Sequence, residues 1–494
     1  MELLSNAEMA KADRLTIVGG TAGLTLMERA GAAVADAVAA RYPVGSKVVV
    51  LAGPGNNGGD GFVAARLLAM RGFRVHLMLA GEVAGLKGDA AAAAAQWKGP
   101  VASPHPDGFA NARVVVDALF GAGLDRPVEG QARAMIDAMN AQPVPILAID
   151  LPSGINGATG AVMGVAVNAT QSVTFFRKKV GHMLLPGRLH CGRVSVADIG
   201  IPPTVLAEVG VQTFENVPQL WRALFPHPQS TGHKYDRGHA VVVSGPLWST
   251  GAARLAARAA LRTGAGLVTI ASPRDALPVN AAANLAVMVR PVDGAGELSE
   301  FLTDRRLNTI ALGPGLGVGA ATCDAVLAAL SGERAVVLDA DAITSFAGEP
   351  ARLAEALRSR ATRPTVLTPH EGEFTRYFGG LDDRTKVGSK LDRARLAASL
   401  VGSIVVLKGA DTVVAAPNGR AAIAANAPPY LATAGAGDVL TGMVAGLLAQ
   451  EMPAFEAAAA AVWLHGEAAR VVGPGLISED LSEALPKVYR DLLG

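Results

Sequence analysis

Cysteine, aromatic residues and net charge are all scarce in this sequence of 494 residues. Cys191 and Cys323 are the only cysteines and fall in different halves of the chain, which argues against a disulfide framework and a cysteine-based metal site. A reducing compartment suits such a chain, so we expect it to be cytoplasmic. The net charge is +1, which gives no electrostatic reason to expect a nucleic-acid surface.

Long hydrophobic runs are missing as well. No uninterrupted apolar run reaches the roughly 18 residues that a membrane span needs, and we expect no membrane segment. Residues Met1 to Glu8 lack the basic stretch and apolar core of a signal peptide. Hydrophobic residues and glycine are abundant, at 50% of the chain and 57 residues, which favours closely packed α/β layers. The length predicts two or more domains.

The first half begins with a pattern of helix, strand, turn, helix and strand. Apolar spacing predicts a helix from Ala7 to about Arg41, and Lys47–Ala52 reads as a buried strand. A turn rich in glycine and asparagine follows at Gly53–Gly61, and then a helix is predicted at Phe62–Arg71 before a strand at Arg74–Leu79. The turn therefore lies at the carboxyl end of a buried strand, where ligands bind in such sheets.

This glycine-rich turn permits two interpretations. Its glycines match the dinucleotide fingerprint at Gly53, Gly55 and Gly58, which is compatible with a Rossmann dehydrogenase. However, Pro54 stiffens the turn, and the turn adds oxygen-bearing side chains that a pyrophosphate loop does not need, at Asn56, Asn57 and Asp60. Such oxygens suit sugar hydroxyls or a hard cation. An ordinary tight turn without a ligand is the third possibility.

Two later strands also end in polar residues. A strand at 113–116 leads to Asp117, and a strand at 145–149 leads to Asp150, with Ser153 shortly after. Because the ends of parallel strands gather along one edge, Asn57, Asp117 and Ser153 can meet at one cation. The three together carry one formal negative charge, which suits a monovalent ion better than a divalent one.

Residues 1 to about 210 resemble the NAD(P)H-hydrate epimerase family through the segments Gly53–Gly61, Asp117–Gly123 and Asp150–Gly154. The resemblance implies a Rossmann-like three-layer α/β/α sandwich at 1–212, which interconverts the R and S forms of hydrated NADH and NADPH. It implies that potassium binds to Asn57, Asp117 and Ser153, and that Asp150 performs acid–base chemistry. The implied substrate-binding residues are Asn56, Asn57, Gly58, Gly59, Asp60, Gly121, Ala122, Gly123, Leu124, Asp125, Arg126, Pro127 and Asp150.

The second half repeats a rhythm of apolar strands followed by polar turns, which predicts a largely parallel sheet. Its most informative stretch is Thr433–Asp438, where small residues precede an apolar helix. Free backbone N–H groups and the helix dipole favour an anion at such a turn. Asp438 beside an anion suggests a proton-handling role, although aspartate also caps helices without any catalytic role.

Residues of about 220–494 resemble the ribokinase-like fold, and within it the ADP- or ATP-dependent NAD(P)H-hydrate dehydratases. The segments that carry the resemblance are His233–Lys234, Gly313–Gly317, Asp339–Ala342, Thr368–Glu373, Lys408–Gly409 and Gly435–Asp438. The resemblance implies a ribokinase-like α/β/α domain at 213–494 that removes water from the S hydrate and uses Mg²⁺ with ADP or ATP.

The dehydratase resemblance also implies roles for particular residues. Asp438 would be the catalytic base, and Asp339 and Glu373 are weaker candidates for magnesium or water contacts. The hydrate would bind to Ala252, Gly315, His370 and Asp438, and the nucleotide to Lys408, Gly409, Ala410, Asp411, Thr412, Gly435 and Gly437.

The sequence departs from the dehydratase pattern at two places. Tyr235 stands where a glycine is expected, and Ala436 occupies a place in the anion turn where a second glycine or a threonine is expected. Either change bears on the choice of nucleotide. Two alternatives stay open, namely a second half that is a kinase for a hydroxymethylpyrimidine or a sugar, and a first half that binds without catalysis. We expect small-molecule substrates, no nucleic-acid or membrane partner, and a homo-oligomer.

Overall fold

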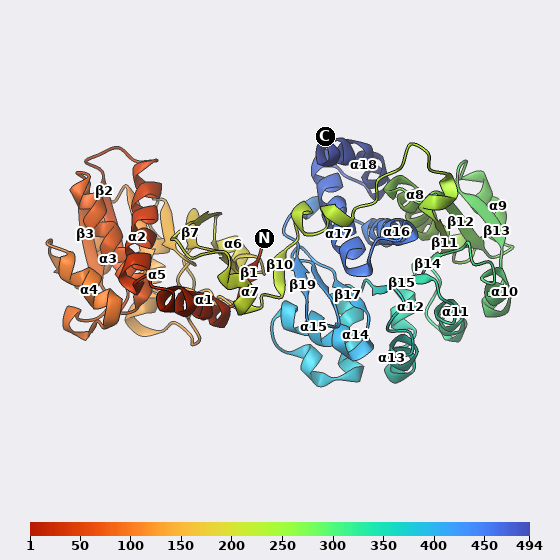
Figure 1. The fold of residues 1–494 in the computed structure, drawn as a ribbon, viewed down its shortest axis with the longest axis horizontal. Coiled ribbons are helices and arrows are strands. Elements are labelled where there is room, and N and C mark those ends of the chain that lie inside the picture. Colours follow the sequence, from red (N-terminus) through yellow and green to blue (C-terminus); the bar gives the residue numbers. More distant parts are fainter. The chain divides into compact units, whose positions relative to one another are not determined.

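The structure is a computed structural model that describes all 494 residues. It contains two compact units, Glu2–Thr213 and Phe214–Gly494, the second of which includes Met1 (Figure 1). No helix in either unit combines the length and the apolar character needed to cross a membrane.

The unit Glu2–Thr213 is built on a seven-stranded sheet in which every adjacent pair is parallel. In spatial order the strands are β4 (Val101–Ala102), β3 (Arg74–Leu79), β2 (Lys47–Ala52), β5 (Val114–Ala118), β6 (Ile146–Ile149), β7 (Gln171–Phe175) and β9 (Arg193–Ala197). A separate parallel pair joins β1 (Leu3–Leu4) to β8 (Lys178–Lys179). The helices are α1 (Asn6–Val18), α2 (Gly23–Ala39), α3 (Asn56–Met70), α4 (Gly88–Gln96), α5 (Gly130–Asn140), α6 (Gly187–His190) and α7 (Val205–Val209).

Helices cover both faces of this sheet. Val48 and Val50 of β2 pack in one core with α2, α3 and α4. Val49 and Leu51 of the same strand pack in a second core with α5. Because successive side chains of a strand point to opposite faces, this alternation places the sheet between two helical layers. The predicted three-layer α/β/α arrangement is thereby confirmed.

Two predicted helices have different bounds in the structure. The helix predicted from Ala7 to Arg41 is two helices, because the chain turns at Gly19 and Gly20, and Gly20 takes a φ of +102° that ends a right-handed helix. The helix predicted at Phe62–Arg71 already begins at Asn56, inside the glycine-rich segment.

The early start of α3 follows from close backbone packing. A side chain at Gly58 would place its Cβ 1.9 Å from the carbonyl oxygen of Gly53. A side chain at Gly53 would meet the carbonyl oxygen of Leu119 at the same distance. Tertiary contact therefore compensates for the weak helix propensity of glycine in this segment.

The unit Phe214–Gly494 contains a ten-stranded sheet that begins with β10 (Thr213–Glu215). The next strands in space are β19 (Ala421–Ile423), β18 (Val413–Ala415), β17 (Ile404–Leu407), β16 (Thr365–Leu367) and β15 (Ala335–Leu338). They are followed by β14 (Thr309–Leu312), β11 (His239–Val243), β12 (Leu267–Ser272) and β13 (Met288–Pro291). The strands from β17 to β13 pair in parallel, whereas β17–β18 and β18–β19 are antiparallel.

Helices again flank the sheet on both faces (Figure 1). One face carries α8 (Gly251–Thr263), α16 (Ala436–Ala449), α17 (Ala454–Val472) and α18 (Ser478–Leu493). The remaining helices are α9 (Leu277–Ala282), α10 (Gly294–Phe301), α11 (Ala320–Leu330), α12 (Asp341–Thr344), α13 (Pro350–Arg358), α14 (Glu371–Leu381) and α15 (Lys390–Val401). The predicted α/β class and largely parallel sheet are confirmed for this half too.

Candidate active sites

A cavity of about 620 Å³ opens in the unit Glu2–Thr213 at the carboxyl ends of the strands. Most of the predicted substrate residues line it, namely Asn56, Asn57, Asp60, Gly121, Ala122, Gly123, Leu124, Asp125, Arg126 and Asp150. Gly58, Gly59 and Pro127 are not among the lining residues. Gly58 and Gly59 are buried inside α3, where their lack of a side chain permits close packing. Predicted residues from separate parts of the sequence therefore lie together at one cavity.

Asp150 presents a charged carboxylate at this cavity. Its Oδ1 accepts hydrogen bonds from Lys179 Nζ and Thr174 Oγ1, both at 2.7 Å, and its Oδ2 accepts one from the Ala122 N–H at 3.3 Å. Burial acts to raise the pKa of Asp150, but Lys179 and the other partners outweigh it and hold the pKa below its usual range. The backbone carbonyl of Asp150 lies 2.8 Å from His182 Nε2. Asp150 is therefore ionised and fixed in place.

Lys179 is a buried lysine that lines this cavity. The sequence alone permits Lys178 and Lys179 to contact ligand phosphates or to form a solvated basic turn, and in the structure the Lys179 side chain is only 3% exposed and is paired with Asp150. The available signal was weak, because a pair of adjacent lysines does not show which one points inward. Burial of a lysine is rare unless it is paired, but its partner comes from a distant part of the sequence.

Asp117 and Ser153 form a second polar group beneath the loop that follows β5. Ser153 Oγ donates to Asp117 Oδ1 at 2.6 Å, and the Ser153 N–H donates to Asp117 Oδ2 at 2.8 Å. Asp117 is fully buried, which raises its pKa to about 6 although these hydrogen bonds oppose the rise. No cationic side chain pairs with it. Asn57 lies at the same loop, since a side chain on Gly121 would come 3.2 Å from Asn57 Oδ1.

These three residues fit a monovalent cation. Asp117 supplies a buried negative charge without a cationic partner, and Ser153 and Asn57 supply neutral oxygens, which are the donors that hard cations prefer. The buried Nδ2 of Asn57 also has no hydrogen-bond partner. The structure contains no set of three or more His, Cys, Asp or Glu side chains placed to hold a metal ion, so any such site depends on neutral oxygens.

The second site lies in the unit Phe214–Gly494, where Asp438 occupies the first turn of α16. Gly435 precedes the helix with a φ of +85°, a conformation that favours glycine, and the turn exposes the first N–H groups of the helix. Burial raises the pKa of Asp438 to about 6, and the negative charge of Asp339 adds to the rise while Lys408 opposes it. Asp438 is thus a carboxylate that changes charge near neutral pH, as a general base requires.

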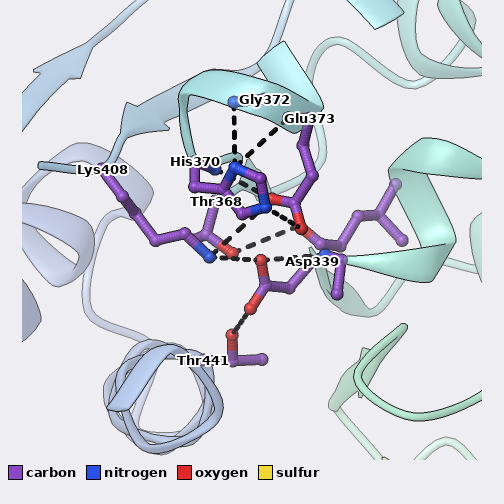
Figure 2. Close-up of polar contacts among 9 residues, drawn as sticks. Asp339, Thr368, His370, Gly372, Glu373, Lys408 and Thr441 are labelled. Carbon is purple, nitrogen blue, oxygen red and sulfur yellow. Dashed lines mark hydrogen bonds and ion pairs between the residues drawn. The ribbon is translucent and has the colours of Figure 1, made fainter. Parts of the chain in front are cut away.

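Lys408 and Asp339 lie at the centre of the polar cluster in Figure 2. Lys408 Nζ donates to Asp339 Oδ1 at 2.7 Å and lies 4.0 Å from Glu373 Oε2. The other oxygen of Asp339 accepts from Thr441 Oγ1 of α16 at 2.7 Å. Burial opposes the charge on Lys408, but Asp339 and Glu373 together raise its pKa. The amine of Lys408 therefore balances the carboxylates of the cluster.

His370 closes another side of this cluster. It caps α14, where its Nδ1 accepts from the Gly372 N–H at 2.9 Å, and its Nε2 lies 3.2 Å from Glu373 Oε1 (Figure 2). Two other residues predicted for the hydrate pocket also lie together, since a side chain on Gly315 would come 3.6 Å from the Ala252 Cβ. The carboxyl ends of β11, β14 and β16 therefore bring these predicted pocket residues to one edge of the sheet.

The segment Lys408–Thr412, predicted to hold the nucleotide, forms a turn fixed by its own side chains. Thr412 Oγ1 donates to the carbonyl of Gly409 at 2.7 Å, and Asp411 Oδ1 accepts from Lys390 Nζ at 2.8 Å. Asp411 and Thr412 are both buried, so the backbone of the turn is better placed for a ligand than these two side chains. Lys390 and Thr441 are polar residues at this site that we did not predict. Lys390 is the first residue of α15, and Thr441 lies in the interior of the apolar helix α16.

Comparison with known proteins supports both halves. A family model described as NAD(P)H-hydrate dehydratase matches residues 240–487, and one described as YjeF-related protein N-terminus matches residues 23–181. A protein of Salinibacter ruber named bifunctional NAD(P)H-hydrate repair enzyme Nnr is 36% identical over 535 residues, which cover 100% of this chain and 97% of that relative. The chain belongs to the family of bifunctional NAD(P)H-hydrate repair enzymes.

Other members of the NAD(P)H-hydrate repair family match over a similar length. The protein of that name from Pyrobaculum aerophilum is 34% identical and aligns with 99% of this chain and 98% of its own. Among solved structures, the ADP/ATP-dependent NAD(P)H-hydrate dehydratase of Bacillus subtilis, co-crystallised with ATP and Mg²⁺, is 28% identical with a TM-score of 0.49. It covers 56% of this chain and 98% of its own. The family predicted from the motifs is confirmed.

Proposed function

We propose that this repair enzyme restores hydrated NADH and NADPH through two activities on one chain. Residues 1–212 would interconvert the R and S hydrates, and residues 213–494 would dehydrate the S hydrate with ADP or ATP. The full-length relationship to bifunctional NAD(P)H-hydrate repair enzymes carries this proposal. It is supported by an ionised Asp150 in the cavity of one unit and by Asp438 at the anion turn of the other.

The dehydration needs phosphoryl transfer because hydroxide is a poor leaving group, as the high pKa of water indicates. Asp438 would take the proton of the hydrate hydroxyl while that oxygen attacks the terminal phosphoryl group. The N–H groups of the turn at Gly435–Gly437 would then stabilise the negative charge of the phosphate. The phosphorylated hydroxyl would leave as phosphate while the adjacent ring carbon loses a proton to solvent, and the nicotinamide ring would recover its double bond.

Magnesium fits this site as a partner of the nucleotide phosphates. Mg²⁺ in proteins commonly takes one or two carboxylates and fills its remaining positions with phosphate oxygens and water. Asp339 and Glu373 would supply the carboxylate side, and a bound Mg²⁺ would neutralise phosphate charge during transfer. The turn Lys408–Thr412 would hold the nucleotide, and Ala252, Gly315 and His370 would contact the hydrate.

In the first domain, Asp150 would move a proton at the hydrated carbon. Inverting that carbon requires its C–O bond to break and to form again, and the ionised Asp150 would also steady the positive charge that develops on the ring. A potassium ion held by Asn57, Asp117 and Ser153 would supply positive charge beside the loop Gly121–Pro127 that lines the cavity.

The test of this proposal follows absorbance at 340 nm, where reduced nicotinamide absorbs. Purified protein is mixed with equal amounts of R and S hydrated NADH, Mg²⁺, K⁺ and either ADP or ATP. Complete recovery of NADH is expected, and the faster nucleotide identifies the phosphate donor. Recovery that stops near half would contradict the epimerase assignment. No recovery with either nucleotide would contradict the repair function and favour a small-molecule kinase.

The potassium proposal leads to a separate prediction. Asp117→Asn removes the only formal charge of the proposed site at nearly constant volume, so epimerisation should lose most of its response to added K⁺. The measurement is the initial rate of R-to-S conversion against KCl, with N-methylglucamine chloride holding the ionic strength constant. Asp137→Asn on the exposed side of α5 is the matched control and should keep the wild-type response. An unchanged potassium response in Asp117→Asn would count against the site.

A further inference from the structure

The cavity of the first domain contains acidic side chains whose roles differ. Asp150 comes from the end of β6, Asp60 from α3 and Asp13 from α1, and all three line the cavity. Lys179 pairs with Asp150 alone, at 2.7 Å. One carboxylate of this set is therefore fixed in its ionised form, and the other two lack a cationic contact.

Asp60 has the surroundings of a carboxyl group that keeps its proton. It makes no hydrogen bond or ion pair with another side chain. Burial raises the pKa of Asp60 well above its ordinary value, and the negative charges of Asp150 and then Asp13 raise it further, while Lys179 opposes them only from a distance. Asp60 and Asp150 thus lie in one cavity, and their surroundings favour opposite protonation states.

Inversion of a hydrated carbon needs both of these states at once. The departing hydroxyl must receive a proton to leave as water, and the water that adds must lose one. A single carboxylate on one side of the ring can serve only one of these transfers at a time, whereas a pair of groups in opposite states serves both.

We propose that Asp60 is the second proton-transfer group of the epimerase, working as the partner of Asp150. This inference rests on the proposed epimerase function. The protonated Asp60 gives its proton to the hydroxyl as the C–O bond breaks, and one water leaves. A second water then forms the new C–O bond and passes one proton to Asp150. Each turnover consumes and releases one water, and it leaves Asp60 ionised and Asp150 protonated, which is the arrangement needed for the reverse conversion.

Charged groups on the helices that border the cavity leave Asp60 without a cationic partner. Helix α2 presents Glu28, which Arg66 of α3 neutralises at 2.5 Å, and α4 presents Asp89 at the cavity. The buried His182 beside Asp150 has its pKa lowered to about 4 by burial, so it stays neutral.

Asp13 is the competing candidate for the proton donor. Burial raises its pKa as well, but the attraction of Lys179 is the next largest influence and favours the ionised form of Asp13. For Asp60 the next largest influence is the repulsion by Asp150, which favours the protonated form. Asp60 is therefore the better donor of the two.

The test separates the R and S hydrates by chromatography and measures their interconversion by the full-length protein without nucleotide, so that the dehydratase is idle. The wild-type rate should fall as pH rises through the raised pKa of Asp60 and fall again at low pH as Asp150 is protonated. Asp60→Asn should lower the rate about 10²- to 10⁴-fold, the usual contribution of a general acid. It should also slow exchange of the hydroxyl with ¹⁸O-labelled water to the same extent. Asp60→Glu should recover part of the rate and should shift the pH at which the rate falls on the alkaline side.

Three comparisons make the test decisive. Asp36→Asn changes an exposed aspartate of α2 that pairs with Arg71 and should leave rate and profile unchanged. Thermal unfolding of the Asp60 variants followed by circular dichroism reports whether the unit Glu2–Thr213 is folded, and dehydration of pure S hydrate reports on the other unit. If the wild type does not interconvert the hydrates, the epimerase function fails and this inference fails with it. The assignment of Asp60 alone is overturned if the wild type is active but Asp60→Asn keeps both its rate and the fall of the rate at high pH. It is also overturned if Asp13→Asn, and not Asp60→Asn, abolishes that fall.

Discussion

Replacement of Asp438 by asparagine is expected to lower the rate of dehydration about 10²- to 10⁴-fold and to leave epimerisation unchanged. Asparagine keeps the size of the side chain but cannot accept the hydroxyl proton. Production of NADH from pure S hydrate measures the first activity, and interconversion of R and S without nucleotide measures the second. A variant that keeps more than a tenth of the wild-type dehydration rate would contradict the role of Asp438 as the base.

The pH dependence of this activity follows from the same residue. Asp438 must be ionised to accept a proton, and its pKa is about 6, so wild-type dehydration should be near its maximum above pH 7 and fall about tenfold per unit below pH 6. Its folded pKa exceeds the unfolded value of 3.8, so the folded state binds the proton more tightly. The ionised Asp438 therefore destabilises the fold, and this effect grows as pH rises through the interval from 3.8 to about 6.

The destabilising effect of the ionised Asp438 provides a control against misfolding. Asp438→Asn should raise the thermal unfolding temperature at pH 8 and change it little at pH 3.5, where the wild-type carboxyl is already neutral. Asp324→Asn is the matched substitution in the same unit. The Asp324 side chain is 59% exposed, and its partner Arg352 lies 3.7 Å away, so this exposed ion pair contributes little to stability. The substitution should alter neither activity nor unfolding temperature. Loss of activity together with loss of stability in Asp438→Asn would point to structural damage instead.

Replacement of Lys408 by methionine should destabilise the unit Phe214–Gly494 by about 3–5 kcal/mol, the usual cost of leaving a buried charge without its partner. The Asp339 side chain is 2% exposed and would lose the ammonium group that donates to it at 2.7 Å. Dehydration should be lost as well, because Asp438 borders the same cluster. Urea unfolding followed by circular dichroism measures the change in stability.

A double substitution tests whether the ion pair between Lys408 and Asp339 accounts for this loss of stability. Lys408→Met combined with Asp339→Asn removes both charges, so its free energy of unfolding should be higher than that of Lys408→Met alone by 1 kcal/mol or more, on the order of measured coupling energies. Arginine at position 408 is a useful comparison, since it keeps the charge but replaces a compact ammonium with a planar fork. If the effects of the two substitutions simply add, Lys408 and Asp339 do not depend on each other.

Asp150 and Asp438 show why much of the two sites could be predicted from the sequence. Asp150 directly follows the apolar strand β6, and the carboxyl ends of parallel strands converge on one edge of a sheet. Asp438 instead lies in the small-residue turn that opens the apolar helix α16, where free N–H groups favour an anion. The order of residues along the chain therefore carries spatial information in an α/β protein. The same logic placed Asp117 and Ser153 together, and the structure joins them by two hydrogen bonds.

The partners of Lys179 and Lys408 could not be predicted from the sequence in this way. In the structure both lysines are paired with a carboxylate of the protein, Asp150 and Asp339 respectively, and the sequence did not predict these pairs. The choice between a ligand phosphate and an internal carboxylate depends on which way a flexible side chain turns. No local pattern records that direction. The start of α3 was missed for a related reason, since the glycines that weaken a helix in isolation are required here by close packing.

Helix α16 connects Asp438, the proposed catalytic base, to the interior of its unit. Asp438, Gly442 and Gly446 follow one another at intervals of four residues and so share one side of the helix. A Cβ at Gly442 would come 2.0 Å from the carbonyl oxygen of Ala256, and one at Gly446 would come 2.6 Å from that of Ala260, so α16 rests directly on the main chain of α8. Side chains in a core can adapt to substitution by changing rotamer, but two main chains in contact cannot.

The spacing between α16 and α8 on this face of the sheet is therefore fixed by the thickness of two backbones. A single methyl group at position 442 would push the two helices apart and move Asp438 with α16.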